Sequence, residues 1–398
     1  MIFPPTLQQL KVLVAPDSFK GSLSASEAAL YISRGVSLTL PSAHVSLKPM
    51  ADGGEGTADA IAATLGGSHA SIQVMDANGG IVNMPYVVCE NQTYGRFAAF
   101  EVASVVGLHD ATVNPEVRTT RGIGQALRAL HKLGHRTVVI GLGGSSTMDA
   151  GAGLLAEVAC DFKDADGHVH SPTFATLHRV RTVSWRAQDN WLREMKIVGL
   201  SDVTAPLCGP YGASHIFGGQ KGFESLDHAD SVLSRFGEVC EKSLNVQALG
   251  RPGAGAAGGL GFALILLGAV VLPGATFILE ASGLTNSLAD YDWIITGEGK
   301  SDLQTLMGKG PFLLAQLARA KGIPITLLSG SIEERADLAV AFDGCFSLMN
   351  KPGTLQHAMK NAGPMLSAAS SSLTRLFLAA RKRSVNSTNS FGNESGST

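Results

Sequence analysis

The ionisable side chains that could do chemistry in this chain stand in loops that follow short apolar strands. The clearest case begins at Trp293, Ile294 and Ile295, which have the bulk of a buried strand, and continues to residue 311 as a polar loop. Ligands of α/β sheets bind outside the carboxyl ends of the strands. Two acids and two lysines in such a place suit a charged substrate, and the glycines would let the backbone turn beside it. The residues of this loop that concern us are Gly297, Glu298, Gly299, Lys300, Asp302 and Lys309.

The same arrangement occurs twice near the N-terminus. An apolar strand over residues 11–15 is followed by Asp17 and Lys20, and then by a capping-box pattern that predicts a helix from about residues 24–27. A second short strand, residues 45–47, precedes Asp52 and Glu55 and a helix over about 58–65. Acids therefore repeatedly follow a strand and precede a helix.

The middle of the chain supplies loops of small residues. A buried strand over residues 136–141 leads into a glycine and serine loop, after which we expect a helix whose free N–H groups lie beside Ser145–Thr147, a favourable geometry for an anion. Tight packing would also select small residues there. The candidate site residues of the middle region are Gly143, Gly144, Ser145, Ser146, Asp149, Asp202 and Lys221.

Two familiar nucleotide-binding motifs do not account for these loops. Residues 253–258 match the GxGxxG pattern, and Glu280 follows 22 residues after residue 258, as in a dinucleotide fold. However, residues 245–251 do not form the apolar strand that this motif requires. A P-loop sequence is also absent. Acids for magnesium and proton transfer, lysines for phosphate and backbone N–H loops are together the parts that phosphoryl transfer needs.

Composition sets the broad class of the protein. The 398 residues are 45% hydrophobic and 16% charged, which predicts a globular protein of two or three domains. A net charge of -2 gives no electrostatic case for binding nucleic acid or an anionic membrane. Five scattered cysteines are typical of reduced thiols in a cytoplasmic protein. The longest apolar run, residues 260–272, is shorter than a membrane span and predicts a buried helix.

The order of elements predicts an α/β fold of two domains. The first and last thirds alternate strand, loop and helix, whereas residues 71–100 are rich in β-type alternation. We expect a discontinuous Rossmann-like parallel-sheet domain, residues 1–72 and 286–382, with a large mixed α/β domain, residues 73–285, inserted in it. The last helix should cover about residues 354–382, and residues 383–398 have the polar composition of a disordered tail.

Several blocks, taken in order, resemble the type I glycerate kinase family (glycerate 2-kinase). Coverage extends from about residue 11 to residue 380, and the blocks are 15–23, 50–57, 143–145, 206–210, 220–222, 252–261 and 296–299 with Gln304 and Thr305. The resemblance implies two α/β domains, one inserted in the other, and Mg²⁺-dependent phosphorylation of D-glycerate by ATP. The expected product is 2-phosphoglycerate; without the family the sequence does not exclude 3-phosphoglycerate.

The resemblance also suggests roles for the loop residues. Asp302 or Asp202 would accept the proton of the glycerate hydroxyl, with Asp17, Lys20 and Lys309 completing the catalytic group. The nucleotide would be bound by Gly143, Gly144, Ser145, Ser146, Asp149, Lys221, Gly297 and Lys300. Mg²⁺ would be held by Asp52, Glu55 and Glu298.

This chain departs from the family pattern at three positions. Met148 and Ala205 replace asparagines, and Lys300 replaces an arginine, so hydrogen-bonding groups and a bidentate fork are lost. These changes favour one alternative, a catalytically weakened paralogue that binds glycerate or nucleotide. A second, weaker alternative is an NAD-dependent oxidoreductase, which only the glycine run at 253–258 favours. A homo-oligomer is compatible with the sequence.

Overall fold

The chain forms two compact α/β units. The computed structural model describes residues 10–170, 172–186, 190–306, 308–333, 336–349 and 352–391. The first unit comprises Met1–Met50 and Gly283–Thr398, and the second comprises Ala51–Ser282. The predicted discontinuous organisation is therefore present, but the units divide after residue 50 and after residue 282, whereas the sequence placed the divisions after 72 and 285. The first boundary differs because the helix at 57–65 packs on strands of the second unit.

A five-stranded, fully parallel sheet forms the centre of the first unit. Its three central strands are rich in buried apolar residues, which suits a sheet that is covered on both faces. In sheet order the strands are β14 (Gly344–Ser347), β13 (Ile325–Ile332), β12 (Trp293–Ser301), β1 (Lys11–Val14) and β2 (His44–Leu47). This confirms the predicted Rossmann-like parallel sheet.

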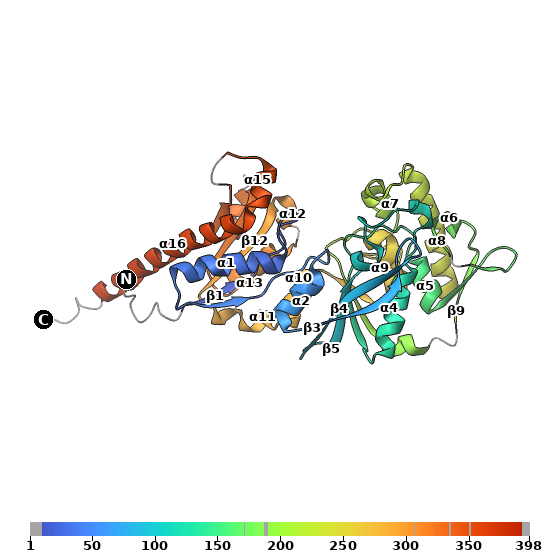
Figure 1. Ribbon diagram of the computed structural model, residues 1–398, viewed down its shortest axis with the longest axis horizontal. Helices are drawn as coiled ribbons and strands as arrows, with labels where there is room; N and C mark the ends of the chain where they lie inside the picture. The colour runs from blue at the N-terminus through green and yellow to red at the C-terminus, as the bar shows by residue number, and fades with distance from the viewer. Residues whose placement is uncertain are drawn as a thin grey trace. The chain divides into compact units, whose positions relative to one another are not determined.

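Two long helices cover one face of this sheet. Figure 1 shows α1 (Ala25–Thr39) and α16 (Ala362–Phe391) side by side, and Trp293 of β12 stacks on Phe377 of α16 with ring centroids 4.5 Å apart. The predicted capping box of α1 is confirmed, because Glu27 N–H donates to Ser24 Oγ and Ser24 N–H donates to Glu27 Oε2. The other helices of this unit are α11 (Leu284–Ser287), α12 (Leu303–Leu306), α13 (Gly310–Ala320), α14 (Ala336–Ala341) and α15 (Leu355–Lys360).

The C-terminal region differs in part from the prediction. Instead of one helix over 354–382, α15 ends before Asn361 and α16 begins at Ala362. α16 continues past residue 383, where the sequence predicts a disordered tail, and ends at Phe391. Residues 392–398 lie outside the described residues.

The second unit is built on a mixed six-stranded sheet. β4 is antiparallel to both β3 and β5, and all the remaining pairs are parallel. A turn at Asn78-Gly79-Gly80 joins β3 to β4, and Gly79 has the positive φ (89°) that favours glycine there. In sheet order the strands are β11 (Val270–Leu272), β10 (Lys196–Leu200), β6 (Thr137–Gly141), β5 (Gly95–Glu101), β4 (Ile81–Asn91) and β3 (Ser68–Met75).

Helices and a small antiparallel sheet complete this unit. The small sheet has the order β8 (Val169–His170), β7 (Cys160–Lys163) and β9 (Thr182–Trp185). The helices are α2 (Thr57–Leu65), α3 (Ala103–Val106), α4 (Arg121–Lys132), α5 (Ala152–Val158), α6 (Phe174–Leu177), α7 (Ala213–Phe217), α8 (Leu226–Leu244), α9 (Ala256–Leu266) and α10 (Gly274–Ala281).

The apolar run at 260–272 forms two elements and not one helix. α9 is buried along its whole length, as predicted, but it ends at Leu266, and the chain turns at Gly268 (φ 85°) before β11. Among the described residues, no helix is long and apolar enough to cross a membrane. The five cysteines all lie among the described residues, and no disulfide joins them.

Candidate functional site

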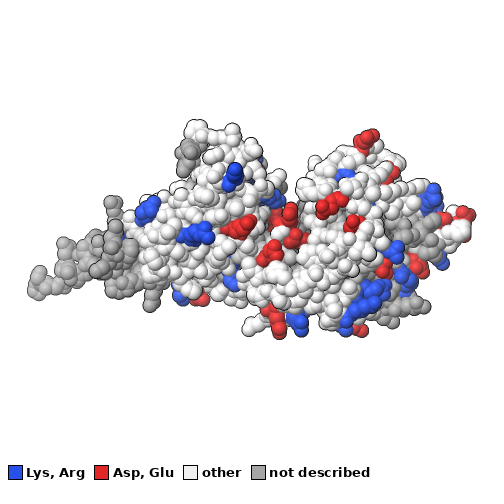
Figure 2. Space-filling view, viewed as in Figure 1, with Lys and Arg blue, Asp and Glu red and all other residues white. Residues whose placement is uncertain are grey.

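The predicted site residues form two groups, one in each unit. The first unit carries Asp17, Lys20, Gly297, Glu298, Lys300, Asp302 and Lys309, and the second carries Asp52, Glu55, Gly143, Gly144, Ser145, Ser146, Asp149, Asp202 and Lys221. On the face shown in Figure 2, most of the described surface belongs to uncharged residues; several acidic side chains lie next to one another, and the basic ones are spread out. The two groups are described in turn.

Parallel pairing of β1 with β12 joins the loops of the first group. Asp17 N–H donates to Gly297 O (2.8 Å), and Thr296 Oγ1 donates to Ala15 O (2.8 Å). The expected tight turn at Gly297 is not formed, because β12 continues to Ser301. Glycine is required for another reason: a Cβ at Gly297 would overlap the carbonyl oxygen of Leu328 on β13. Gly297 is therefore a packing residue of the sheet.

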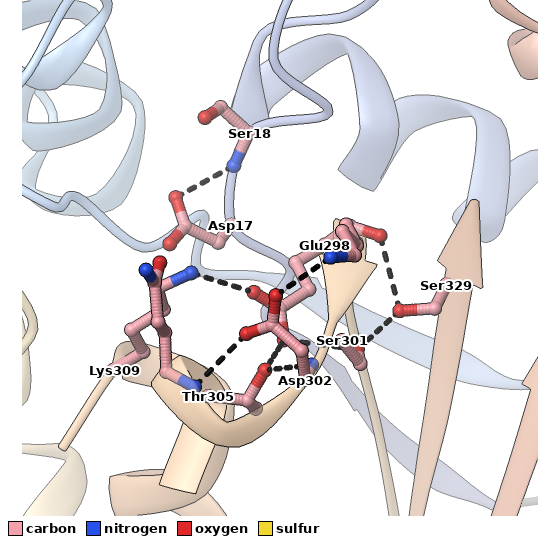
Figure 3. A network of polar contacts seen from close by, with 10 residues as sticks. Asp17, Ser18, Glu298, Ser301, Asp302, Thr305, Lys309 and Ser329 are labelled. Carbon is pink, nitrogen blue, oxygen red and sulfur yellow. Dashed lines mark hydrogen bonds and ion pairs between the residues drawn. The ribbon is translucent and has the colours of Figure 1, made fainter. Parts of the chain in front are cut away.

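Glu298 is the centre of a buried hydrogen-bond network, which Figure 3 shows together with its neighbours. Its side chain is only 4% exposed. Oε1 accepts from Ser301 Oγ (2.9 Å) and Thr305 Oγ1 (2.6 Å), and Oε2 lies 3.5 Å from the Nζ atom of Lys309. Both oxygens are thus directed to partners within the unit. The Ser301 hydroxyl also contacts the Ser329 hydroxyl on β13.

Asp302 lies next to this network and is more accessible. Lys300 Nζ lies 3.1 Å from Asp302 Oδ2 and 3.1 Å from Glu333 Oε1. The hydrogen bond from Lys300 lowers the pKa of Asp302 below its usual value, although partial burial opposes the shift. Asp302 is therefore a carboxylate at neutral pH, as a proton acceptor must be.

The two predicted lysines of the first group differ in environment. Lys309 is the N-cap residue of α13 and its ammonium pairs with Glu298, so its position is fixed by a buried acid. Lys20 is exposed on the loop after β1. That loop is itself held at Ser22, whose hydroxyl donates to the carbonyl oxygen of Met359 (2.6 Å) on α15.

In the second unit, carboxylates again follow strands or precede helices. Asp52 Oδ1 accepts from Gly54 N–H (2.8 Å), and Glu55 is exposed. Glu101, at the end of β5, accepts from Ala58 N–H (2.8 Å) at the start of α2, and burial raises the pKa of its carboxyl. Asp202 Oδ1 accepts from Gly274 N–H (3.2 Å), the first residue of α10. Asp202 therefore contributes to a helix N-terminus.

The glycine and serine loop differs from the expected helix N-terminus. α5 begins only at Ala152, and Ser146 N–H donates to Val106 O (2.7 Å), so it is not directed outward. Ser145, Ser146 and Asp149 are buried, whereas Gly144 is exposed and Gly143 partly so. The accessible part of the loop is thus its glycine pair.

Asp149 and Lys221 also point into the second unit. Asp149 is fully buried and accepts from the N–H groups of Thr120, Gly151 and Gly153 and from the Thr120 hydroxyl. Burial raises the pKa of its carboxyl, and these hydrogen bonds oppose the shift. Lys221 is 3% exposed and its ammonium bonds only to groups of the 145–147 segment. Neither side chain is presented to a ligand, contrary to the prediction.

The glycine run at 253–258 serves packing between two segments. A Cβ at Gly258 would overlap Thr147 O, and Ala150 N–H donates to Gly258 O (3.1 Å). The described residues from 245 to 255 contain no strand, so the dinucleotide arrangement is absent. The match to GxGxxG reflects close contact of two backbones and gives no support to an oxidoreductase.

Sequence reasoning assigned no role to several polar residues of these sites: Glu101, Arg118, Ser301, Thr305 and Ser329. A signal existed for two of them. Glu101 and Ser329 each follow an apolar strand segment, 97–100 and 325–328, which is the rule that identified the other acids. Arg118 carries no comparable local signal, because its partners are distant in the sequence.

Comparison with known proteins gives consistent results. Residues 12–378 match the model of the glycerate kinase family. A glycerate kinase of Bacillus subtilis is 36% identical over 89% of this chain and 94% of its own length, and a glycerate 2-kinase of Escherichia coli is 35% identical over the same shares. A crystal structure from Salmonella typhimurium LT2, provisionally named glycerate kinase 2, has a TM-score of 0.82 and 33% identity, covering 94% of this chain and all of that one.

Proposed function

The chain belongs to the glycerate kinase family, and we propose that it transfers the γ-phosphoryl group of ATP to a hydroxyl of D-glycerate. The observation that carries this proposal is the Glu298 network, in which an accessible carboxylate, Asp302, and an oriented ammonium, Lys309, lie between the end of β12 and the start of α13. Phosphoryl transfer needs little more from a protein than such positioning and charge neutralisation. The proposed product is 2-phosphoglycerate, in line with the E. coli relative.

We assign the proton acceptor to Asp302 in preference to Asp202. The hydrogen bond from Lys300 keeps Asp302 ionised, whereas Asp202 accepts from the first N–H group of α10, a typical stabilising role. Lys309 and Lys20 would bind the glycerate carboxylate or the transferred phosphoryl group. Asp17, which is buried beside β12, would orient the loop that carries Lys20.

We assign the nucleotide phosphates to the backbone of the loop at Gly144, its exposed residue, since Gly143 N–H already donates to Gly53 O (2.7 Å). Asp52 and Glu55 suit Mg²⁺, which prefers carboxylate oxygens; Glu298 does not, because both of its oxygens already have partners. When bound, Mg²⁺ would neutralise charge on the phosphates. We predict a cytoplasmic location from cysteine usage. Assembly into a homo-oligomer is compatible with the sequence.

The test is to incubate the purified protein with Mg-ATP and D-glycerate, follow ADP release, and identify the product by phosphorus NMR. Release of ADP that depends on D-glycerate would exclude a paralogue that only binds ligands; no stimulation by glycerate would refute the proposed function. Asp302→Asn should then lower kcat by about 10²-fold or more, the usual contribution of a general base. Asp202→Asn is the matched control, and a larger loss in that variant would reverse the assignment.

A further inference from the structure

Lys221 makes an unusual set of contacts for a lysine. It ends a short helical turn, Gly219–Lys221, and its ammonium is enclosed in the second unit. Nζ donates to Ser145 O (2.8 Å), Ser145 Oγ (2.7 Å) and Thr147 O (2.9 Å). All three donors of the ammonium are therefore used on a single segment of the chain, the one that follows Gly143 and Gly144.

Arg118 binds the same segment from another part of the chain. Its Nη1 donates to Ser146 O (3.2 Å) and to the carbonyl oxygen of Lys221 (3.0 Å), and its Nε donates to Val113 O (3.1 Å). The carbonyl groups of residues 145, 146 and 147 consequently each accept a hydrogen bond from a buried cation. Arg118 also holds the backbone of Lys221 in place.

This arrangement is costly if it serves packing alone. Burial of charged groups carries a large desolvation penalty, and apolar side chains of similar volume often stabilise a core equally well. Burial lowers the pKa of Lys221 to about 7; the nearby carboxylate of Asp149 opposes the shift and Arg118 adds to it. The partners fit either protonation state, because the two carbonyls accept while the Ser145 hydroxyl can accept or donate.

We propose that Lys221, assisted by Arg118, is a positioning residue for the nucleotide-binding turn at Gly143 and Gly144. By directing three consecutive carbonyl groups into the unit, the two cations remove these negative dipoles from the side that phosphates would approach. They also fix the segment that follows Gly144, the exposed residue of this turn, so that the Gly144 backbone is arranged before the nucleotide binds; Gly143 N–H is already held by Gly53 O (2.7 Å). The inference rests on the proposed function, which assigns nucleotide phosphates to this turn.

The test compares Lys221→Met, which keeps the length of the side chain and removes the ammonium, with Lys242→Met on the exposed surface of α8. The Kd of the non-hydrolysable analogue AMP-PNP is measured by calorimetry, and hydrogen exchange is measured for peptides spanning 143–148. Loss of charge-assisted hydrogen bonds should raise this Kd about tenfold in Lys221→Met, with faster exchange at 143–148. The KM for ATP should rise with the Kd and by a larger factor than the KM for D-glycerate, since the proposal assigns the turn to the nucleotide.

Two results would overturn the inference. One is a Kd for AMP-PNP equal to that of Lys242→Met with unchanged exchange at 143–148; the other is a lower unfolding midpoint with unchanged Kd, which would leave Lys221 a purely structural role. If Lys221→Met does not fold, Arg118→Lys serves instead, because it keeps a charge but not the two-pronged contact, and its Kd should also rise. Absence of glycerate-dependent ADP release in the wild type would refute the proposed function, whereas the AMP-PNP measurements would still test the turn.

Discussion

Thr305→Val should destabilise the first unit far more than a usual change of hydroxyl to methyl. Thr305 is fully buried, and its hydroxyl donates to Glu298 Oε1 (2.6 Å) while accepting from Asp302 N–H (3.1 Å). Valine has nearly the same shape as threonine, but it can neither donate nor accept a hydrogen bond. Removal of a hydrogen bond to a buried carboxylate costs about 1.5–3 kcal/mol, and the unpaired Asp302 N–H adds about 1 kcal/mol. The expected loss in the free energy of unfolding is therefore about 3 kcal/mol.

The assay should report the first unit alone, because two units need not unfold in one step. Urea unfolding followed by hydrogen exchange of peptides from β1, β12 and β13 meets this need. Thr137→Val, on β6 of the second unit, is the control: it exchanges the same atoms at a buried position outside the network. A loss below about 1 kcal/mol for Thr305→Val, within the range of ordinary substitutions, would refute the central place given to the Glu298 network.

Of three further predictions, two concern the charge of a single lysine and one concerns a departure from the family pattern. Lys300→Met removes the main cause of the low pKa of Asp302, so the acid limb of the kcat/KM profile against pH should move to higher pH. The pKa of Lys221 is about 7 in the folded chain and 10.5 when unperturbed, so the unfolded chain binds more protons between these values. Wild-type stability should therefore rise with pH across this window by up to about 1.4 kcal/mol per pH unit, and urea midpoints of Lys221→Met should lack that rise. Met148→Asn should lower the midpoint without tightening AMP-PNP binding, because it buries an amide in an apolar core.

The first unit could be predicted well where local pattern decides the structure. The apolar runs that form β1, β12 and β13 and the capping box of α1 are visible in the sequence. The extension of β12 to Ser301 is not, because a polar segment became a strand through its pairing with β13, where Glu298 lies opposite Ser329 and Lys300 opposite Ser331. Strand pairing with a distant segment thus overrode the local signal of a loop.

The second group of residues was harder to predict because burial depends on distant contacts. Lys221 lies 76 residues from Ser145 in the sequence, so nothing local distinguishes it from an exposed lysine that waits for phosphate. The run of small residues at 143–153 was correctly seen as special, but the reason differs in part. Gly151 and Gly153 allow close packing with α9 and with the segment before α4, while only Gly143 and Gly144 stay accessible.

The structure also alters the argument for a weakened paralogue. Met148 has no exposed surface and its sulfur lies 3.8 Å from the Ser214 hydroxyl, so the side chain belongs to the core and does not itself meet a ligand. Lys300 lacks the fork of an arginine, but it still pairs with Asp302 and Glu333 at 3.1 Å each, and the first of these contacts keeps the proposed base ionised. Both departures therefore leave the charges of the reacting groups intact. Loss of activity would have to come from the third departure, Ala205, whose carbonyl oxygen accepts from Gly255 N–H (2.9 Å), or from the backbone near residue 148, next to the segment that Lys221 and Arg118 hold in place.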